Sequence, residues 1–163
     1  MITKPERQKA KGKRQKLKVG TDEIHDVLQG YAKRGVFGSF NQAGDTFKFT
    51  WLWNLPFELR FRQGRLTFPR LLPHAAPLQT DLRRFIRGCC SKNRPEHRRV
   101  DSKRLKVTCA NRRGAISLSF QIAGGHYEYG TRKAINLVNE IFLSFLSVNH
   151  HQYLVEHFRR PED

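Results

Sequence analysis

Arginine and lysine side chains are the residues of this sequence with the clearest chemical potential. The 163-residue chain has 31 Lys and Arg against 14 Asp and Glu, which gives a formal net charge of +17. Residues 1–20 carry +7 of this excess, because eight basic residues there face Glu6 alone. Residues 83–113 carry a further +10, with twelve basic residues against Glu96 and Asp101. Clusters of this kind favour polyanion binding, because each neutralised phosphate releases condensed counterions.

Period-two spacing predicts where many of these cations point. Basic residues that alternate with apolar ones in a strand lie on the face opposite the core. If the strands share one sheet, these cations form a stripe that continues into a hairpin turn, and the basic N-terminal segment adds to it. The signal is electrostatic and carries no sequence readout. We therefore predict a non-enzymatic module that binds an anionic partner, most simply nucleic acid, through Arg60, Arg62, Arg104, Lys106, Arg112, Arg113, Lys13 and Arg14. The alternative without a binding role is a solvated sheet face that is basic only for solubility.

Catalytic and metal-binding patterns are weak. Cys89 and Cys90 are adjacent, without the two-residue spacing of tetrahedral zinc pairs. His151 and His157 are six residues apart and do not share a helical face. Glu140 is a candidate acid or base in the most apolar segment, but a carboxylate there is more simply a partly solvated or paired group. We expect no catalytic residues, no metal and no cofactor.

Length and composition favour one domain. Hydrophobic residues make up 38% of the chain and aromatic residues 11%, which is enough for a core. Residues 1–20 have almost no apolar residues and are predicted to be a disordered basic arm, leaving residues 21–163 as a single domain. No apolar run is long enough for a membrane span. Three cysteines fit a reducing compartment, so a cytoplasmic location is expected.

Helix periodicity appears in four segments. The spacing predicts helices from Thr21 to about residue 34, from Leu78 to about Cys90, and from Thr131 to about Leu146, with a short terminal helix at 149–158. The third of these is apolar around most of its circumference, so more than one side must be covered. Either the terminal helix or a second copy of the chain provides that cover, and we expect a homodimer.

Strand periodicity fills the remainder. Alternation predicts strands at 46–53, 57–62, 66–68, 105–109 and 116–122, with a further short strand at 126–129 and a strand or loop at 36–40. A two-residue turn at Gln63 and Gly64 would place Phe61 opposite Leu66. The predicted core includes Phe49, Trp51, Phe120, Leu137 and Ile141.

These elements predict an α+β fold in two layers, a mainly antiparallel sheet with helices packed on one face, in the order α-βββ-α-ββ(β)-α-α. The order resembles the type III secretion chaperone-like fold and its relatives over about residues 21–146. The resemblance rests on element order alone, so no functional residue is carried over. It implies an alternative function as a dimeric module that binds protein segments.

Overall fold

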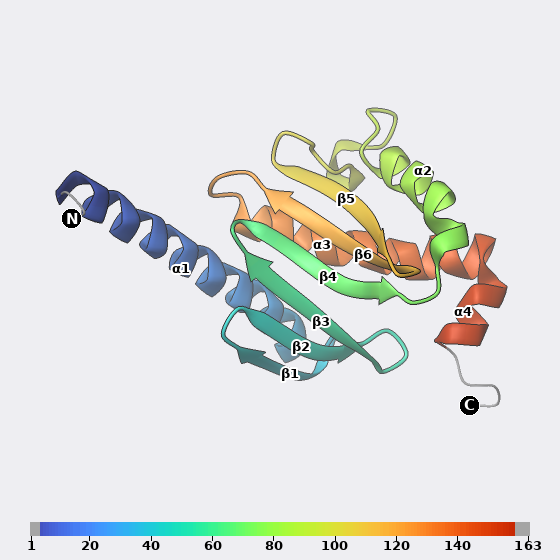
Figure 1. Cartoon of the computed structure of the whole chain (residues 1–163). Helices are drawn as coiled ribbons and strands as arrows, with labels where there is room; N and C mark the ends of the chain where they lie inside the picture. Colours follow the sequence, from blue (N-terminus) through green and yellow to red (C-terminus); the bar gives the residue numbers. More distant parts are fainter. Residues whose placement is uncertain (1–3, 159–163) are drawn as a thin grey trace.

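The computed structural model describes the backbone of residues 4–158 and the side chains from residue 19 to residue 158. The elements follow the chain as shown in Figure 1. They are α1 (Lys4–Lys33), β1 (Gly38–Ala43), β2 (Thr46–Trp51), β3 (Leu55–Arg62), β4 (Arg65–Leu72), the 3₁₀ turn η1 (Ala76–Leu78), α2 (Gln79–Cys89), the 3₁₀ turn η2 (Glu96–Arg98), β5 (Leu105–Arg112), β6 (Ala115–Ile122), α3 (Tyr127–Glu140), the π-helix η3 (Ile141–Asn149) and α4 (His151–His157).

The six strands form one antiparallel sheet in the order β1-β2-β3-β4-β6-β5. Helices α1 and α3 lie behind the sheet in Figure 1, and α2 lies at the β5 edge. We call the opposite side, which no described helix covers, the open face. The predicted α+β fold with helices on one face is therefore confirmed. The first strand group gains β1, in the region that the sequence left as strand or loop.

The core lies between the sheet and the helices. The five predicted core residues are all buried, the most exposed being Trp51 at 7%. Strand β2 ends at Trp51 rather than at residue 53, because Leu52, Trp53 and Asn54 all adopt positive φ and reverse the chain. Trp53 is 42% exposed, so it does not continue the buried face of the strand that the sequence predicts at 46–53.

The β3–β4 hairpin has the register that its sequence predicts. Phe61 lies opposite Leu66, and Arg62 lies opposite Arg65. Gln63 and Gly64 form the two-residue turn with φ of 53° and 74°. Two consecutive positive φ values match the twist of the flanking strands, which is why glycine suits the second position. The turn therefore fixes which side chains of β3 and β4 share the open face.

Helix α1 is longer than predicted. It begins at Lys4 rather than at Thr21, so residues 4–20 are helical where we expected a disordered arm. The segment is rich in Lys, Arg and Gln, which are good helix formers, and its proline lies in the first turn where it is tolerated. Residues 1–3 lie outside the described part of the chain, as do the side chains of Lys13 and Arg14.

Helix α3 also begins earlier than predicted. The expected strand at 126–129 is instead the start of a helix at Tyr127. Thr131 does not cap it, because the Thr131 hydroxyl donates a hydrogen bond to the Tyr127 carbonyl at 2.7 Å within the helix. Gly130 is buried against Ile122, and a Cβ there would lie 2.8 Å from the Ile122 Cγ1. The absence of a side chain at Gly130 therefore lets α3 approach β6 closely.

The apolar sides of α3 and η3 are covered within one chain. Phe142, Phe145 and Leu146 are buried, together with Tyr153 and Leu154 of α4. The terminal helix α4 thus covers the apolar surface for which the sequence offered either this helix or a second copy of the chain. None of the helices in the described part of the chain has both the length and the hydropathy that crossing a membrane demands.

Candidate polyanion-binding surface

A row of cations crosses the open face at one end of the sheet. Arg62 of β3 is the register partner of Arg65 on β4, Arg65 is the partner of Gln121 on β6, and Gln121 is the partner of Lys106 on β5. We call these four residues the cationic row. Since neighbouring strands are about 4.8 Å apart, the row spans about 14 Å.

A second row, of small hydroxyl side chains and one arginine, runs parallel to the first. Arg60 pairs with Thr67, Thr67 with Ser119, and Ser119 with Thr108. The hydroxyls of Thr67 and Ser119 are 3.3 Å apart. Small side chains in this row leave the arginines raised above their surroundings, which produces a groove.

The groove has a volume of about 450 Å³ and contains four arginines. Arg60, Arg62 and Arg65 come from the β3–β4 hairpin, and Arg112 comes from the end of β5. Ser117, Ser119, Gln121 and Thr67 supply hydroxyl and amide groups to its floor. Four guanidinium groups around donors of this type suit the oxygen atoms of phosphates.

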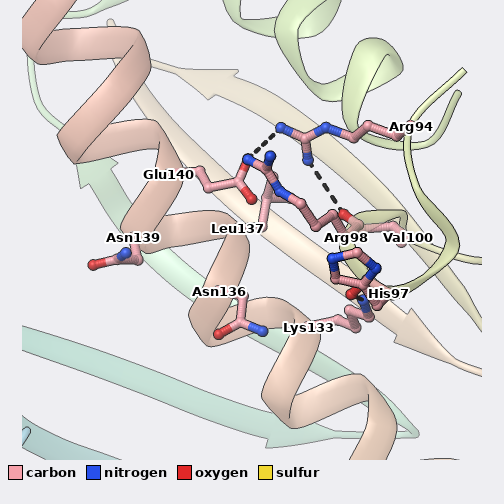
Figure 2. Close-up of a pocket in the computed structure, with 9 residues that line it drawn as sticks. All are labelled: Arg94, His97, Arg98, Val100, Lys133, Asn136, Leu137, Asn139 and Glu140. Carbon is pink, nitrogen blue, oxygen red and sulfur yellow. Dashed lines mark hydrogen bonds and ion pairs between the residues drawn. The ribbon is translucent and has the colours of Figure 1, made fainter.

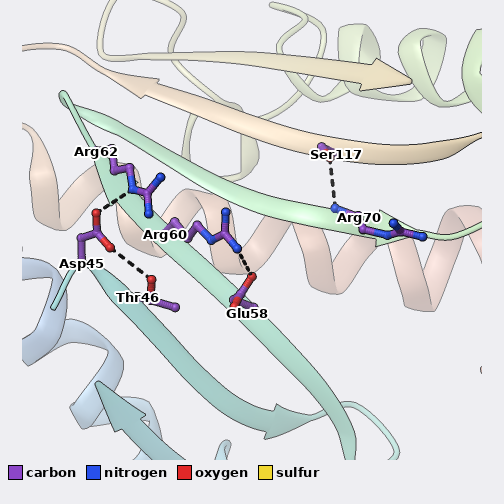
Figure 3. Close-up of polar contacts among 7 residues, drawn as sticks. All are labelled: Asp45, Thr46, Glu58, Arg60, Arg62, Arg70 and Ser117. Atoms are coloured by element: carbon purple, nitrogen blue, oxygen red, sulfur yellow. Dashed lines mark hydrogen bonds and ion pairs between the residues drawn. The ribbon is translucent and has the colours of Figure 1, made fainter. Parts of the chain in front are cut away.

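Two carboxylates lie beside these arginines (Figure 3). Arg62 Nε donates to Asp45 Oδ2 at 2.6 Å, and Arg60 pairs with Glu58 at 3.1 Å. The hydrogen bond from Arg62 is the largest cause that holds the Asp45 pKa below its usual value of 3.8. The Arg62 and Asp45 side chains are 63% and 41% exposed, and surface pairs of this kind contribute only about 0–1 kcal/mol. They are therefore readily exchanged for a phosphate contact.

The juxtaposition of Arg62 and Arg65 costs stability. Like charges directly opposite each other on paired strands are destabilising. Asp45 balances Arg62, whereas Arg65 has Gln121 as its side-chain partner, with Arg65 Nε donating to Oε1 at 3.2 Å. An anion bound between the two arginines would relieve this repulsion.

The structure brings together only some of the residues predicted from the sequence. Arg60, Arg62 and Arg112 line the groove, and Lys106 completes the cationic row. Arg113 occupies the β5–β6 turn, with φ of 55°, and does not line the groove. Lys13 and Arg14 are outside the described side chains.

Arg104 was placed on the wrong face by the strand pattern. It precedes β5 and pairs with Asp101 at 3.0 Å. Its guanidinium lies 3.6 Å from the centroid of the Tyr129 ring on α3, so the side chain belongs to the helix side. The alternation failed here because strand geometry does not yet apply to a residue in the turn before the strand.

Arg65 was missed, although a signal for it existed. It is the first residue of the return strand and alternates with Leu66 and Phe68 in the same way that Arg62 alternates with Phe61. Its position opposite Gln121 required the pairing of β4 with β6, which are separated by more than 40 residues. Local periodicity can identify an outward cation, but not its neighbour on a distant strand.

The aromatic residues of the sheet lie on the other side. Phe47, Phe49 and Trp51 are buried beneath the helices, and the open-face positions of the register-paired strands carry polar, charged or small residues. The described part of this face therefore has no platform on which bases could stack. Its chemistry suits the backbone of a polyanion.

The candidate catalytic groups have structural partners. Glu140 pairs with Arg94 at 2.7 Å, as the paired alternative anticipated. Burial raises the pKa of the Cys89 thiol to about 12, which disfavours the nucleophilic thiolate.

Comparison of the chain with protein-family models, with curated proteins and with solved structures finds no match. The likeness to the secretion chaperone-like fold thus stays an expectation from element order.

Proposed function

We propose that this protein is a non-enzymatic module that binds nucleic acid through its phosphates. The open face of the sheet is the main contact surface, and the basic N-terminal half of α1 is a second one. The observation that carries the proposal is the cationic row, in which Arg62, Arg65 and Lys106 align across four strands.

The dimensions of the row favour a polymer over a small anion. Duplex DNA carries one negative charge per about 1.7 Å of helix axis, so a row about 14 Å long faces several phosphates at once. The groove beside it offers hydroxyl and amide groups that can contact sugar and phosphate oxygens. Because the described part of this face has no exposed aromatic residues, recognition would be largely independent of sequence.

A dimeric protein-binding module is the alternative suggested by element order and by the apolar third helix. The second of these reasons is weakened, because α4 covers that helix within one chain. This alternative predicts no comparable affinity for nucleic acid near physiological salt, so the same experiment separates the two functions.

The proposal is tested by fluorescence anisotropy with labelled single- and double-stranded oligonucleotides over a range of salt concentrations. We expect log affinity to fall linearly with log salt, with a slope of about −0.9 per duplex phosphate contacted. Combined replacement of Arg62, Arg65 and Lys106 by Ala should weaken binding to all sequences alike. The slope should become shallower by roughly one unit for each lost contact.

The matched control removes the same charge from α2. Arg83, Arg84 and Arg87 are exposed on that helix, which lies at the β5 edge of the sheet, and become Ala in the control variant. Thermal melting should show both variants folded, because all six side chains are at the surface. Absence of binding by the wild type at low salt would reject nucleic-acid binding. Equal losses in the two variants would reject the open face as the site.

A further inference from the structure

A second basic site lies on the helix side of the molecule, away from the open face. It is a pocket of about 210 Å³ between α3 and the segment that contains η2. Figure 2 shows Lys133 and Glu140 reaching it from α3, while Arg94, His97 and Arg98 come from the facing segment. None of these residues belongs to the surface assigned above.

The charges of this pocket are not balanced. Its single lining carboxylate, Glu140, is bound to Arg94 at 2.7 Å, with both side chains 24% exposed. Lys133 Nζ donates to the His97 carbonyl at 2.9 Å, which is a neutral acceptor. The guanidinium of Arg98 has no hydrogen-bond or ion-pair partner among the described residues. Two positive charges therefore remain at the pocket without a counterion.

The surrounding electrostatics agree with this imbalance. The pKa of Lys133 is lowered, first by burial and then by the positive charge of Arg104, with Arg94 acting in the same direction. Glu140 opposes these effects but does not overcome them. A bound anion would offset the same repulsion.

We infer that this pocket is a binding site for a phosphate dianion, either inorganic phosphate or a phosphate monoester. Arg98 offers a planar fork that matches two oxygen atoms, and Lys133 has two further N–H donors beyond the one used by His97. The side chain of Asn136 lines the pocket one helical turn from Lys133 and adds an amide donor. The volume is below the roughly 300 Å³ at which sites for drug-sized ligands begin, which favours a small anion.

The inference is independent of the proposed nucleic-acid surface and has its own test. Isothermal titration calorimetry of the full chain with inorganic phosphate, at constant ionic strength in chloride, should show saturable binding to one site. Arg98→Ala should weaken it by about tenfold, as expected when a hydrogen bond to a charged group is lost. The side chain of Arg98 is exposed and has no partner among the described residues, so this variant should keep its fold. The side-chain amide resonances of Asn136 should shift on phosphate addition in the wild type.

The control is Arg132→Ala, which removes one exposed charge from the adjacent position of α3. Arg132 pairs with Glu128 at 3.2 Å and does not line the pocket, so phosphate binding should change by less than twofold. The Ala variant of the cationic row should bind phosphate as the wild type does. Absence of saturable binding by the wild type, or equal losses in Arg98→Ala and Arg132→Ala, would overturn the inference.

Two esters distinguish the source of the phosphate. Phenyl phosphate is a dianionic monoester, and dimethyl phosphate is a monoanionic diester that represents the nucleic-acid backbone. Phenyl phosphate should displace inorganic phosphate. Whichever of these two anions binds with the higher affinity identifies the natural ligand as a phosphate monoester or as free phosphate. If dimethyl phosphate binds as tightly as phenyl phosphate, the assignment is overturned, because the pocket would then bind the phosphodiester of a nucleic-acid backbone equally well.

Discussion

At the scale of single residues, Asp45 is an internal competitor for the proposed partner. Its carboxylate accepts a hydrogen bond from Arg62 at 2.6 Å, at one end of the cationic row. The pair holds the Asp45 pKa below 3.8, so its stabilising contribution is present above that value and is lost only as the pH falls through the lower folded-state pKa. At neutral pH the carboxylate is therefore charged and occupies Arg62.

Asp45→Asn should strengthen binding of double-stranded oligonucleotides at low salt. The gain should be about two- to fivefold, which corresponds to release of an exposed ion pair of up to about 1 kcal/mol. Glu128→Gln is the matched control, because it removes one carboxylate paired with Arg132 on α3. Anisotropy titrations compare the two variants, and equal gains would mean that net charge alone is responsible.

At the scale of elements, the N-terminal half of α1 is a helix that no described core residue anchors. Among the residues of α1 whose side chains the structure describes, Gly20 is the first buried position, packed against the Tyr127 ring, and the buried apolar side chains begin at Ile24. Isolated helical segments of this length are marginal in water. The amides of residues 4–18 should therefore exchange faster than those around Leu28.

Deletion of residues 1–18 tests this view of α1. The melting temperature should change by no more than about two degrees, because the deletion removes no described core contact. Affinity for polyanions should fall and depend less steeply on salt, since the segment is strongly basic. Hydrogen exchange of the full chain completes the test, and strong protection of the segment in the free protein would contradict it.

The sequence predicts those elements whose hydrophobic periodicity or turn residues depend on neighbours near in the chain. The half-buried strands show alternation because each has one face on the core, and the two-residue turn at Gln63 and Gly64 fixes the β3–β4 register. The start of α3 was not predicted in this way, because its packing, with Gly130 close to Ile122 on β6, is a contact between distant elements that local periodicity does not show. The pocket of Arg94 and Glu140 depends on contact between residues 46 positions apart, which periodicity does not encode.

At the scale of the whole molecule, the two basic sites lie on different sides of one sheet. The groove is on the open face, whereas the pocket at Lys133 is beside α3, on the covered side. A polymer bound across the cationic row therefore leaves the pocket accessible to a small anion. The two proposals can thus succeed or fail independently, and the variants of one site serve as controls for the other.

The same arrangement bears on assembly. The reason for expecting a homodimer was the apolar circumference of the third helix, and burial of Phe142, Phe145 and Leu146 with α4 satisfies that requirement inside one chain. Leu143 and Val148 remain 47% and 75% exposed, but isolated apolar residues at a surface are ordinary. We therefore expect light scattering to give a mass near 19.1 kDa over a wide concentration range. A dimer that is lost on Leu143→Glu, but kept in the similarly exposed control Val19→Glu, would show that the exposed side of η3 is an interface.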